Sequence, residues 1–210
     1  MIFEIKRLLY IDFLLILGCS VRRNDGVASN EINFAIDHAL LSEPLSDSTL
    51  QISFSPPRNW TRLSDDVLHL SEHEALMRSL GDSSVSRNQF LAKYGFIDSV
   101  SQSLILVSSL PQFDVSDSSA TMRDFTKFAK RDSSSDVRAN VFISKGKKIH
   151  QLLTIGNNLV AFKMIFSLTG HPSKVGFDFI IPKNAYPQFI KTIESVAGSV
   201  EFIHSITPSS

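Results

Sequence analysis

An α+β domain built on an antiparallel sheet is the fold class that the sequence predicts. Four runs of alternating apolar and polar residues follow one another between residues 137 and 181, with short turns between them. A segment at 184–197 then places its apolar residues on one face of a helix. Because a helix that returns across a meander buries the apolar faces of both, we expect these elements to pack in layers.

The composition is that of a soluble protein with an ordinary core. The 210 residues fit one domain with appendages, and 43% of them are apolar against 20% charged. This excludes a disordered chain and a multi-span membrane protein. The 21 basic and 21 acidic residues give zero net charge, which argues against nucleic acid as the main partner. No motif predicts a cofactor.

The elements before residue 110 mix strand and helix signals. Residues 51–54 alternate and precede two prolines, so we expect a short strand there, and Trp60 starts a second strand or enters the core. A helix is expected over 65–80, followed by one or two helical turns over 86–94 that Gly95 closes. The dense apolar run at 103–109 predicts a buried strand.

The second half of the chain has clearer patterns. Met122, Phe125 and Phe128 share one face of an expected helix. Four strands of an antiparallel meander are then expected at 137–143, 149–155, 159–168 and 175–181. The last helix covers 184–197, and Gly198 is placed to cap its end.

The first eighteen residues have the layout of a secretory signal peptide. Lys6 and Arg7 precede an apolar run at 8–17, which is shorter than the roughly 20 residues that a membrane-spanning helix needs. Glu4 and Asp12 depart from this layout, because acidic residues are costly in such a run. The alternatives are therefore an uncleaved anchor, plain secretion, or the first helix of a cytoplasmic domain.

The segment Ile16-Leu17-Gly18-Cys19 resembles the lipobox of bacterial lipoproteins. The resemblance implies cleavage between Gly18 and Cys19, a diacylglyceryl group on the Cys19 thiol, and acylation, for example by palmitate, of the new amino terminus. Several acyl chains anchor firmly, since each buried CH₂ contributes about 0.8 kcal/mol. Cys19 is the only cysteine, so no disulfide framework is expected. Ser20 resembles the residue that sorts enterobacterial lipoproteins to the outer membrane, facing the periplasm.

The chain is accordingly expected to have three parts. Residues 1–18 are the signal peptide, and residues 19–48 are a polar tether to the lipid, with a short helix over 32–41. Residues 49–205 form the globular domain.

Three features of this domain resemble PsbP-like and Mog1-like domains. They are the opening Phe54-Ser55-Pro56-Pro57-Arg58-Asn59-Trp60, a helix at 120–129 before the meander, and the ending Val196-Ala197-Gly198-Ser199-Val200. The resemblance covers roughly residues 50–203. It implies an αβα sandwich and a noncatalytic binding role.

A candidate metal site lies in the expected helix 65–80. His69-Leu70-Ser71-Glu72-His73 matches the H-x-x-E-H pattern, in which the two histidines bind one zinc and the glutamate acts as a base. A third ligand, typically a glutamate downstream, is not evident, because no Glu occurs between Glu74 and Glu194. An ordinary helix with histidines at the core edge, or adventitious metal binding, explains the pattern as well.

Two further features have alternative interpretations. Lys145, Lys147 and Lys148 form a basic hairpin tip, which is either a solvated turn or a contact to anionic lipid headgroups. Trp60 is either a core-edge residue or a platform on which a ligand stacks.

The sequence thus predicts a lipid-anchored cell-envelope protein that acts as a noncatalytic binding or assembly module. Its partners would be membrane lipid, through Cys19, and an envelope protein or small apolar ligand contacted through the sheet or its edge. The alternative is a metal-dependent envelope hydrolase that uses His69, Glu72 and His73.

Overall fold

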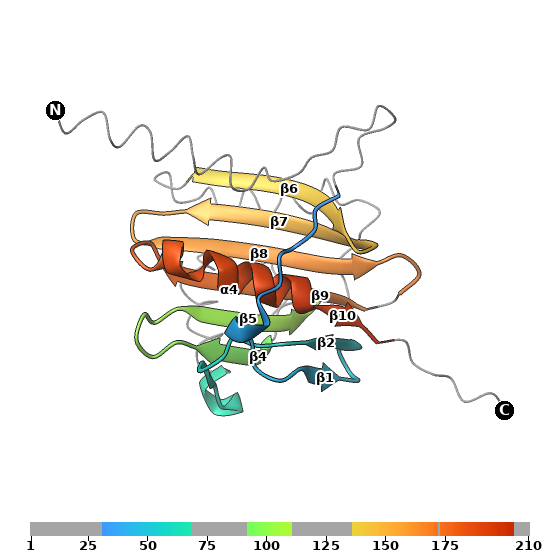
Figure 1. Ribbon diagram of the computed structural model, residues 1–210, viewed down its shortest axis with the longest axis horizontal. Helices are drawn as coiled ribbons and strands as arrows, with labels where there is room; N and C mark the ends of the chain where they lie inside the picture. The colour runs from blue at the N-terminus through green and yellow to red at the C-terminus, as the bar shows by residue number, and fades with distance from the viewer. Residues whose placement is uncertain (1–30, 69–91, 111–135, 172, 204–210) are drawn as a thin grey trace, which may run out of the picture.

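The computed structural model describes residues 31–68, 92–110, 136–171 and 173–203, and confirms the α+β class (Figure 1). Seven antiparallel strands form a large sheet in the order β3-β4-β5-β9-β8-β7-β6. A second sheet, of order β1-β2-β10, and the helix α4 lie over one face of the large sheet (Figure 1).

The strands of the large sheet are β3 (Thr61–Arg62), β4 (Ala92–Ile97), β5 (Leu104–Ser109), β6 (Asp136–Ser144), β7 (Lys147–Ile155), β8 (Leu159–Leu168) and β9 (Lys174–Pro182). Those of the small sheet are β1 (Leu45–Asp47), β2 (Ile52–Phe54) and β10 (Glu201–Phe202). The helices are the short 3-10 helix η1 (His38–Leu40) and α4 (Tyr186–Ser199).

The predicted four-stranded meander is confirmed as β6 to β9. Each strand pairs with the next in an antiparallel register without a shift. Lys145 and Gly146 join β6 to β7 with φ angles of 48° and 75°. Two positive φ angles in a two-residue connection are those of a type I′ turn, whose twist matches that of the paired strands.

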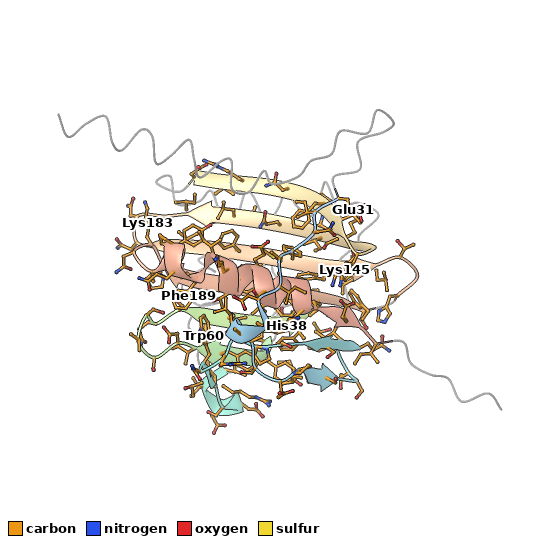
Figure 2. All side chains as sticks on the ribbon, viewed as in Figure 1. Glu31, His38, Trp60, Lys145, Lys183 and Phe189 are labelled. Atoms are coloured by element: carbon orange, nitrogen blue, oxygen red, sulfur yellow. The ribbon has the colours of Figure 1, made fainter. Side chains whose placement is uncertain are left out.

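An aromatic core lies between the two layers. The Phe54 ring of β2 lies 6.0 Å from that of Tyr94, 6.1 Å from that of Phe96 and 5.3 Å from that of Phe177, as centroid distances. Trp60 packs edge-on against Phe189 of α4, with the centroids 5.4 Å apart (Figure 2). Trp60 is therefore a core-edge residue, one of the two roles considered for it.

The predicted helical turns over 86–94 are wrong where the structure describes them. Residues 92–97 form β4, which pairs with β5, because this segment buries Tyr94 and Phe96 in the core. The helix expected over 65–80 begins as predicted, with helical residues 65–68, and its remainder lies outside the described residues. The helix expected at Met122, Phe125 and Phe128 also lies outside them.

Gly198 does not end α4 as a cap. It lies inside the last turn of the helix, and Val200 is the C-cap. A Cβ atom at Gly198 would come within 2.8 Å of the Ile36 Cγ1 and Phe34 Cβ atoms. The glycine therefore permits close packing between α4 and the segment before η1.

The part of the predicted tether that the structure describes, residues 31–48, lies against the domain. The Ala35 N–H donates to the Glu194 carboxylate at 2.9 Å, and the Asp37 N–H donates to Ser195 Oγ at 3.0 Å. Leu41 is only 3% exposed. The folded part thus includes residue 31 rather than beginning at 49, and the helix expected over 32–41 is limited to η1. Within the described ranges, no helix has the length and hydropathy that a membrane crossing requires.

Candidate functional site

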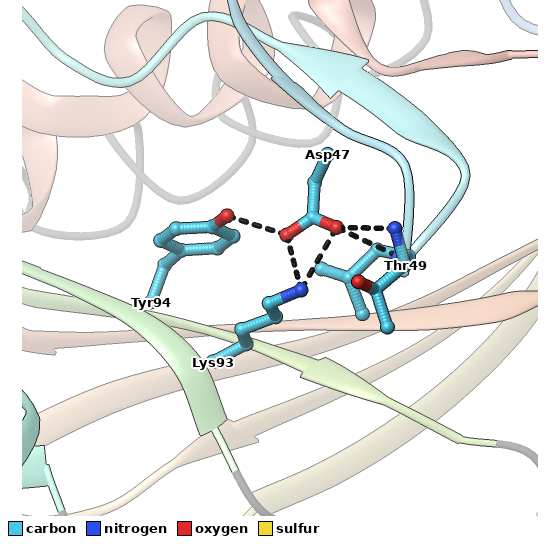
Figure 3. A network of polar contacts seen from close by, with 5 residues as sticks. Asp47, Thr49, Lys93 and Tyr94 are labelled. Atoms are coloured by element: carbon cyan, nitrogen blue, oxygen red, sulfur yellow. Dashed lines mark hydrogen bonds and ion pairs between the residues drawn. The ribbon is translucent and has the colours of Figure 1, made fainter.

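A buried carboxylate joins the small sheet to the large one (Figure 3). Asp47 ends β1 and is 5% exposed. Its Oδ1 atom accepts hydrogen bonds from the N–H groups of Thr49, at 2.7 Å, and Leu50, at 2.9 Å. Lys93 Nζ lies 2.7 Å from Asp47 Oδ2, and the Tyr94 hydroxyl donates to the same oxygen. We call Asp47, Lys93 and Tyr94 with these N–H groups the Asp47 cluster.

The local sequence explains why these groups meet. An aspartate that accepts bonds from the backbone two and three residues later makes an Asx turn, which here connects β1 to β2. Consecutive residues of a strand normally point to opposite faces. The register of β4 shifts between Ala92 and Tyr94, and this irregularity lets both Lys93 and Tyr94 reach Asp47.

Burial and hydrogen bonding determine the protonation states of Asp47 and Tyr94. Burial alone would raise the pKa of Asp47, but the bonds from Lys93, Tyr94 and the backbone outweigh it and lower the pKa to about 2. Burial, together with the bond to the Asp47 carboxylate, raises the pKa of Tyr94 to about 12. The Arg62 guanidinium lies 4.8 Å from the centre of the Tyr94 ring. At neutral pH Asp47 is therefore ionised and Tyr94 protonated, which suits a structural clamp rather than proton transfer.

The predicted basic hairpin tip is less basic at its surface than expected. Lys147 is 3% exposed, and its Nζ donates to the Val200 carbonyl at 2.5 Å, at the C-terminal end of α4. It also lies 3.2 Å from the Glu201 carboxylate. Lys145, at the turn labelled in Figure 2, lies 3.8 Å from the same carboxylate. Lys147 thus compensates the helix C-terminus and is not available to lipid headgroups.

Exposed apolar side chains gather at the outer edge of the large sheet. Val141 and Ile143 of β6 are 40% and 41% exposed. Ile32, also 41% exposed, donates its N–H to the Ile143 carbonyl at 2.8 Å. We call the outer side of residues 137–143 the β6 edge.

The residues that the sequence singled out for chemistry lie outside the described residues. These are Gly18 and Cys19 of the signal-peptide junction, and His69, Glu72 and His73 of the H-x-x-E-H pattern. Within the described ranges, no group of three His, Cys, Asp or Glu residues could hold a metal ion.

Sequence reasoning did not find the Asp47 cluster. The only signal for it was local, an aspartate two residues before a threonine between two short strand patterns. Lys93 lies 46 residues further along the chain, and no pattern connects it to Asp47.

Searches for related proteins identify the fold. No family model and no curated protein matches the chain. The solution structure of cyanobacterial PsbP (CyanoP) from Synechocystis matches with a TM-score of 0.50 and 13% identity, over 88% of this chain and 99% of that one. The Ran-binding protein Mog1p of Saccharomyces cerevisiae matches with a TM-score of 0.46 and 10% identity, over 78% of this chain and 96% of that one. The chain therefore has a PsbP-like α+β fold, as the resemblance predicted, and at these identities the likeness concerns the fold alone.

Proposed function

We propose that this protein is a lipid-anchored component of a bacterial cell envelope that acts as a noncatalytic binding or assembly module. The observation that carries the anchor is the segment Ile16-Leu17-Gly18-Cys19 behind a basic and apolar stretch, with Cys19 as the only cysteine. Acyl chains on Cys19 would hold the domain at the membrane, and Ser20 would direct it to the outer membrane.

The described part of the domain supports binding rather than chemistry. Its most strongly perturbed carboxylate, Asp47, is saturated by donors that hold two sheets together. Lys163 and Asp178, opposite each other on β8 and β9, form an ion pair at 2.6 Å. The β6 edge, in contrast, presents apolar side chains to solvent, which is typical of surfaces that contact another molecule.

The anchor is tested by the mass of the full chain expressed in a bacterium. We expect the envelope fraction to contain a chain that begins at Cys19 and carries acyl groups. Cys19→Ser should abolish both the acyl mass and the cleavage, whereas the neighbouring change Ser20→Ala should leave both intact. A chain that retains Met1 and carries no acyl group would refute the proposal.

A second substitution tests which membrane holds the protein. Ser20→Asp should move the acylated chain from the outer-membrane to the inner-membrane fraction in an enterobacterial host. If wild type and variant fractionate alike, the outer-membrane assignment fails while the anchor stands.

A metal-dependent hydrolase is the second candidate, favoured by the spacing of His69, Glu72 and His73. Metal analysis of the purified full chain distinguishes the two proposals. Stoichiometric zinc that is lost in His73→Ala, and retained in the control His38→Ala on η1, would favour the hydrolase. Folded protein without zinc would remove it.

A further inference from the structure

The β6 edge lacks the usual protection of an exposed strand. Natural edge strands are commonly short or carry lysine or proline, which prevents pairing with another chain. β6 spans Asp136–Ser144 and contains neither residue type. Its two charged side chains, Asp136 and Arg138, form an ion pair with each other at 2.7 Å. Its alternate positions Val137, Ala139, Val141 and Ile143 are all apolar.

The backbone of this edge is oriented for pairing. Ile32 donates its N–H to the Ile143 carbonyl, so the backbone groups of residue 143 point away from β7. Because these directions alternate along a strand, Val137, Ala139 and Val141 also turn their N–H and C=O groups outward. All three residues lie opposite residues of β7, but among the described residues no backbone hydrogen bond reaches their outward N–H and C=O groups. Glu31 and Ile32 pair with Ile143 at the end of the edge, and within the described ranges no other segment pairs with the outer side of residues 137–141.

The opposite edge of the sheet restricts what can pair with β6. That edge is β3, which has only two residues, Thr61 and Arg62. Head-to-tail association of β6 with β3 of another copy would therefore form few bonds. A symmetric β6–β6 contact, in contrast, covers both long edges and closes after two copies.

We infer that the β6 edge binds a second copy of this chain, with the two β6 strands antiparallel. Pairing centred on Ala139 places this small residue against its counterpart and Val137 against the partner's Val141, on the same face of the sheet. On the other face Arg138 lies opposite the partner's Asn140, so no like charges oppose each other directly. The two large sheets become one continuous sheet.

Five residues per strand bury less surface than a permanent dimer needs, so the dimer is weak in dilute solution. An anchor in the membrane would raise the effective concentration of the chains and favour the contact. The dimer rests on the proposed binding function but does not require acylation, so Cys19→Ser chains can test it. Loss of the anchor and loss of the dimer are then measured separately.

Single cysteines in the full chain, purified as Cys19→Ser, test the register. Cα atoms of directly opposed, hydrogen-bonded residues lie about 5.5 Å apart, within the range that a disulfide bridges. Ala139→Cys should therefore form a disulfide-linked dimer under mild oxidation. The control Val100→Cys, which is 90% exposed and lies between β4 and β5, should remain monomeric. Equal cross-linking of the two variants would overturn the inference.

A proline at the same position tests the hydrogen bonds. Ala139→Pro removes an outward N–H group and leaves the bonds between β6 and β7 in place. In sedimentation at increasing concentration, the Cys19→Ser chain should move from 23.4 kDa toward twice that mass. Ala139→Pro should remain monomeric, while Ala139→Ser, which keeps the N–H, should behave as its parent. If the parent chain is monomeric at every concentration, or Ala139→Pro dimerises equally, the inference is wrong.

Discussion

Asp47 concentrates more polar contacts than any neighbouring side chain of the small sheet, because one carboxylate holds a turn, a lysine and a tyrosine. Asp47→Asn removes the charge and leaves Lys93 without its ionic partner. We expect it to lower the free energy of unfolding by about 2 kcal/mol, at the low end for a buried pair because Lys93 is partly exposed. Urea unfolding measures this. Asp136→Asn is the matched control, because the exposed pair of Asp136 with Arg138 contributes less than about 1 kcal/mol.

The same carboxylate makes stability depend on acid. Its pKa is about 2 in the folded chain against an ordinary value of 3.8, so its contribution is complete above pH 3.8 and is lost as pH falls toward 2. The difference in unfolding free energy between wild type and Asp47→Asn should therefore shrink across this interval. A difference that stays constant would show that Asp47 does not titrate as inferred.

His150 makes the stability of the fold depend on pH in a second, higher range. It is fully buried on β7, and burial together with the charge of Lys148 lowers its pKa from 6.5 to about 4. The unfolded chain binds a proton below pH 6.5 that the folded chain binds only near pH 4, so stability should fall as pH decreases between these values, by up to about 3 kcal/mol. Urea midpoints across this range should vary less in His150→Leu. The same change at exposed His38 should have no such effect.

At the scale of elements, the contact of α4 with the segment before η1 depends on a glycine, Gly198, which has no side chain. Gly198→Ala improves helix propensity by up to about 1 kcal/mol, but its Cβ would lie 2.8 Å from atoms of Phe34 and Ile36. We expect a net loss of about 1–2 kcal/mol in unfolding free energy, because overpacking costs more than the propensity gains. Lys191→Ala, exposed on the same helix, is the control. A stabilised Gly198→Ala chain would show that the segment moves aside without cost.

The elements that sequence patterns predicted best are those whose neighbours in space are neighbours in the chain. The meander of β6 to β9 combines alternation with short turns, and both signals are local. β4 was missed because its partner β5 and its core contacts, rather than its own propensity, make it a strand. β1 and β10 are three and two residues long, too short for a periodic signal, and both depend on β2 for their pairing.

The β6 edge and the Asp47 cluster also differ in how far the sequence predicts them. An apolar alternation in residues 137–143 was visible in the sequence, but only the sheet order shows that it lies at an edge. The Asp47 cluster depends on a contact between segments 46 residues apart, for which the chain carries no local signal.

For the whole molecule, the boundary of the folded unit is the feature on which structure and sequence disagree most. Residues 31–48 supply β1, the carboxylate of Asp47 and the buried Leu41, so a chain that begins at residue 49 lacks parts of the core. Burying Leu41 alone contributes about 1.5–3 kcal/mol, and the other contacts bring the loss close to the entire stability of an ordinary domain. We therefore expect chains that begin at residue 49 to be unfolded or aggregated, whereas chains that begin at residue 31 unfold cooperatively. Circular dichroism during urea titration distinguishes the two, and equal midpoints would mean that residues 31–48 are a tether after all.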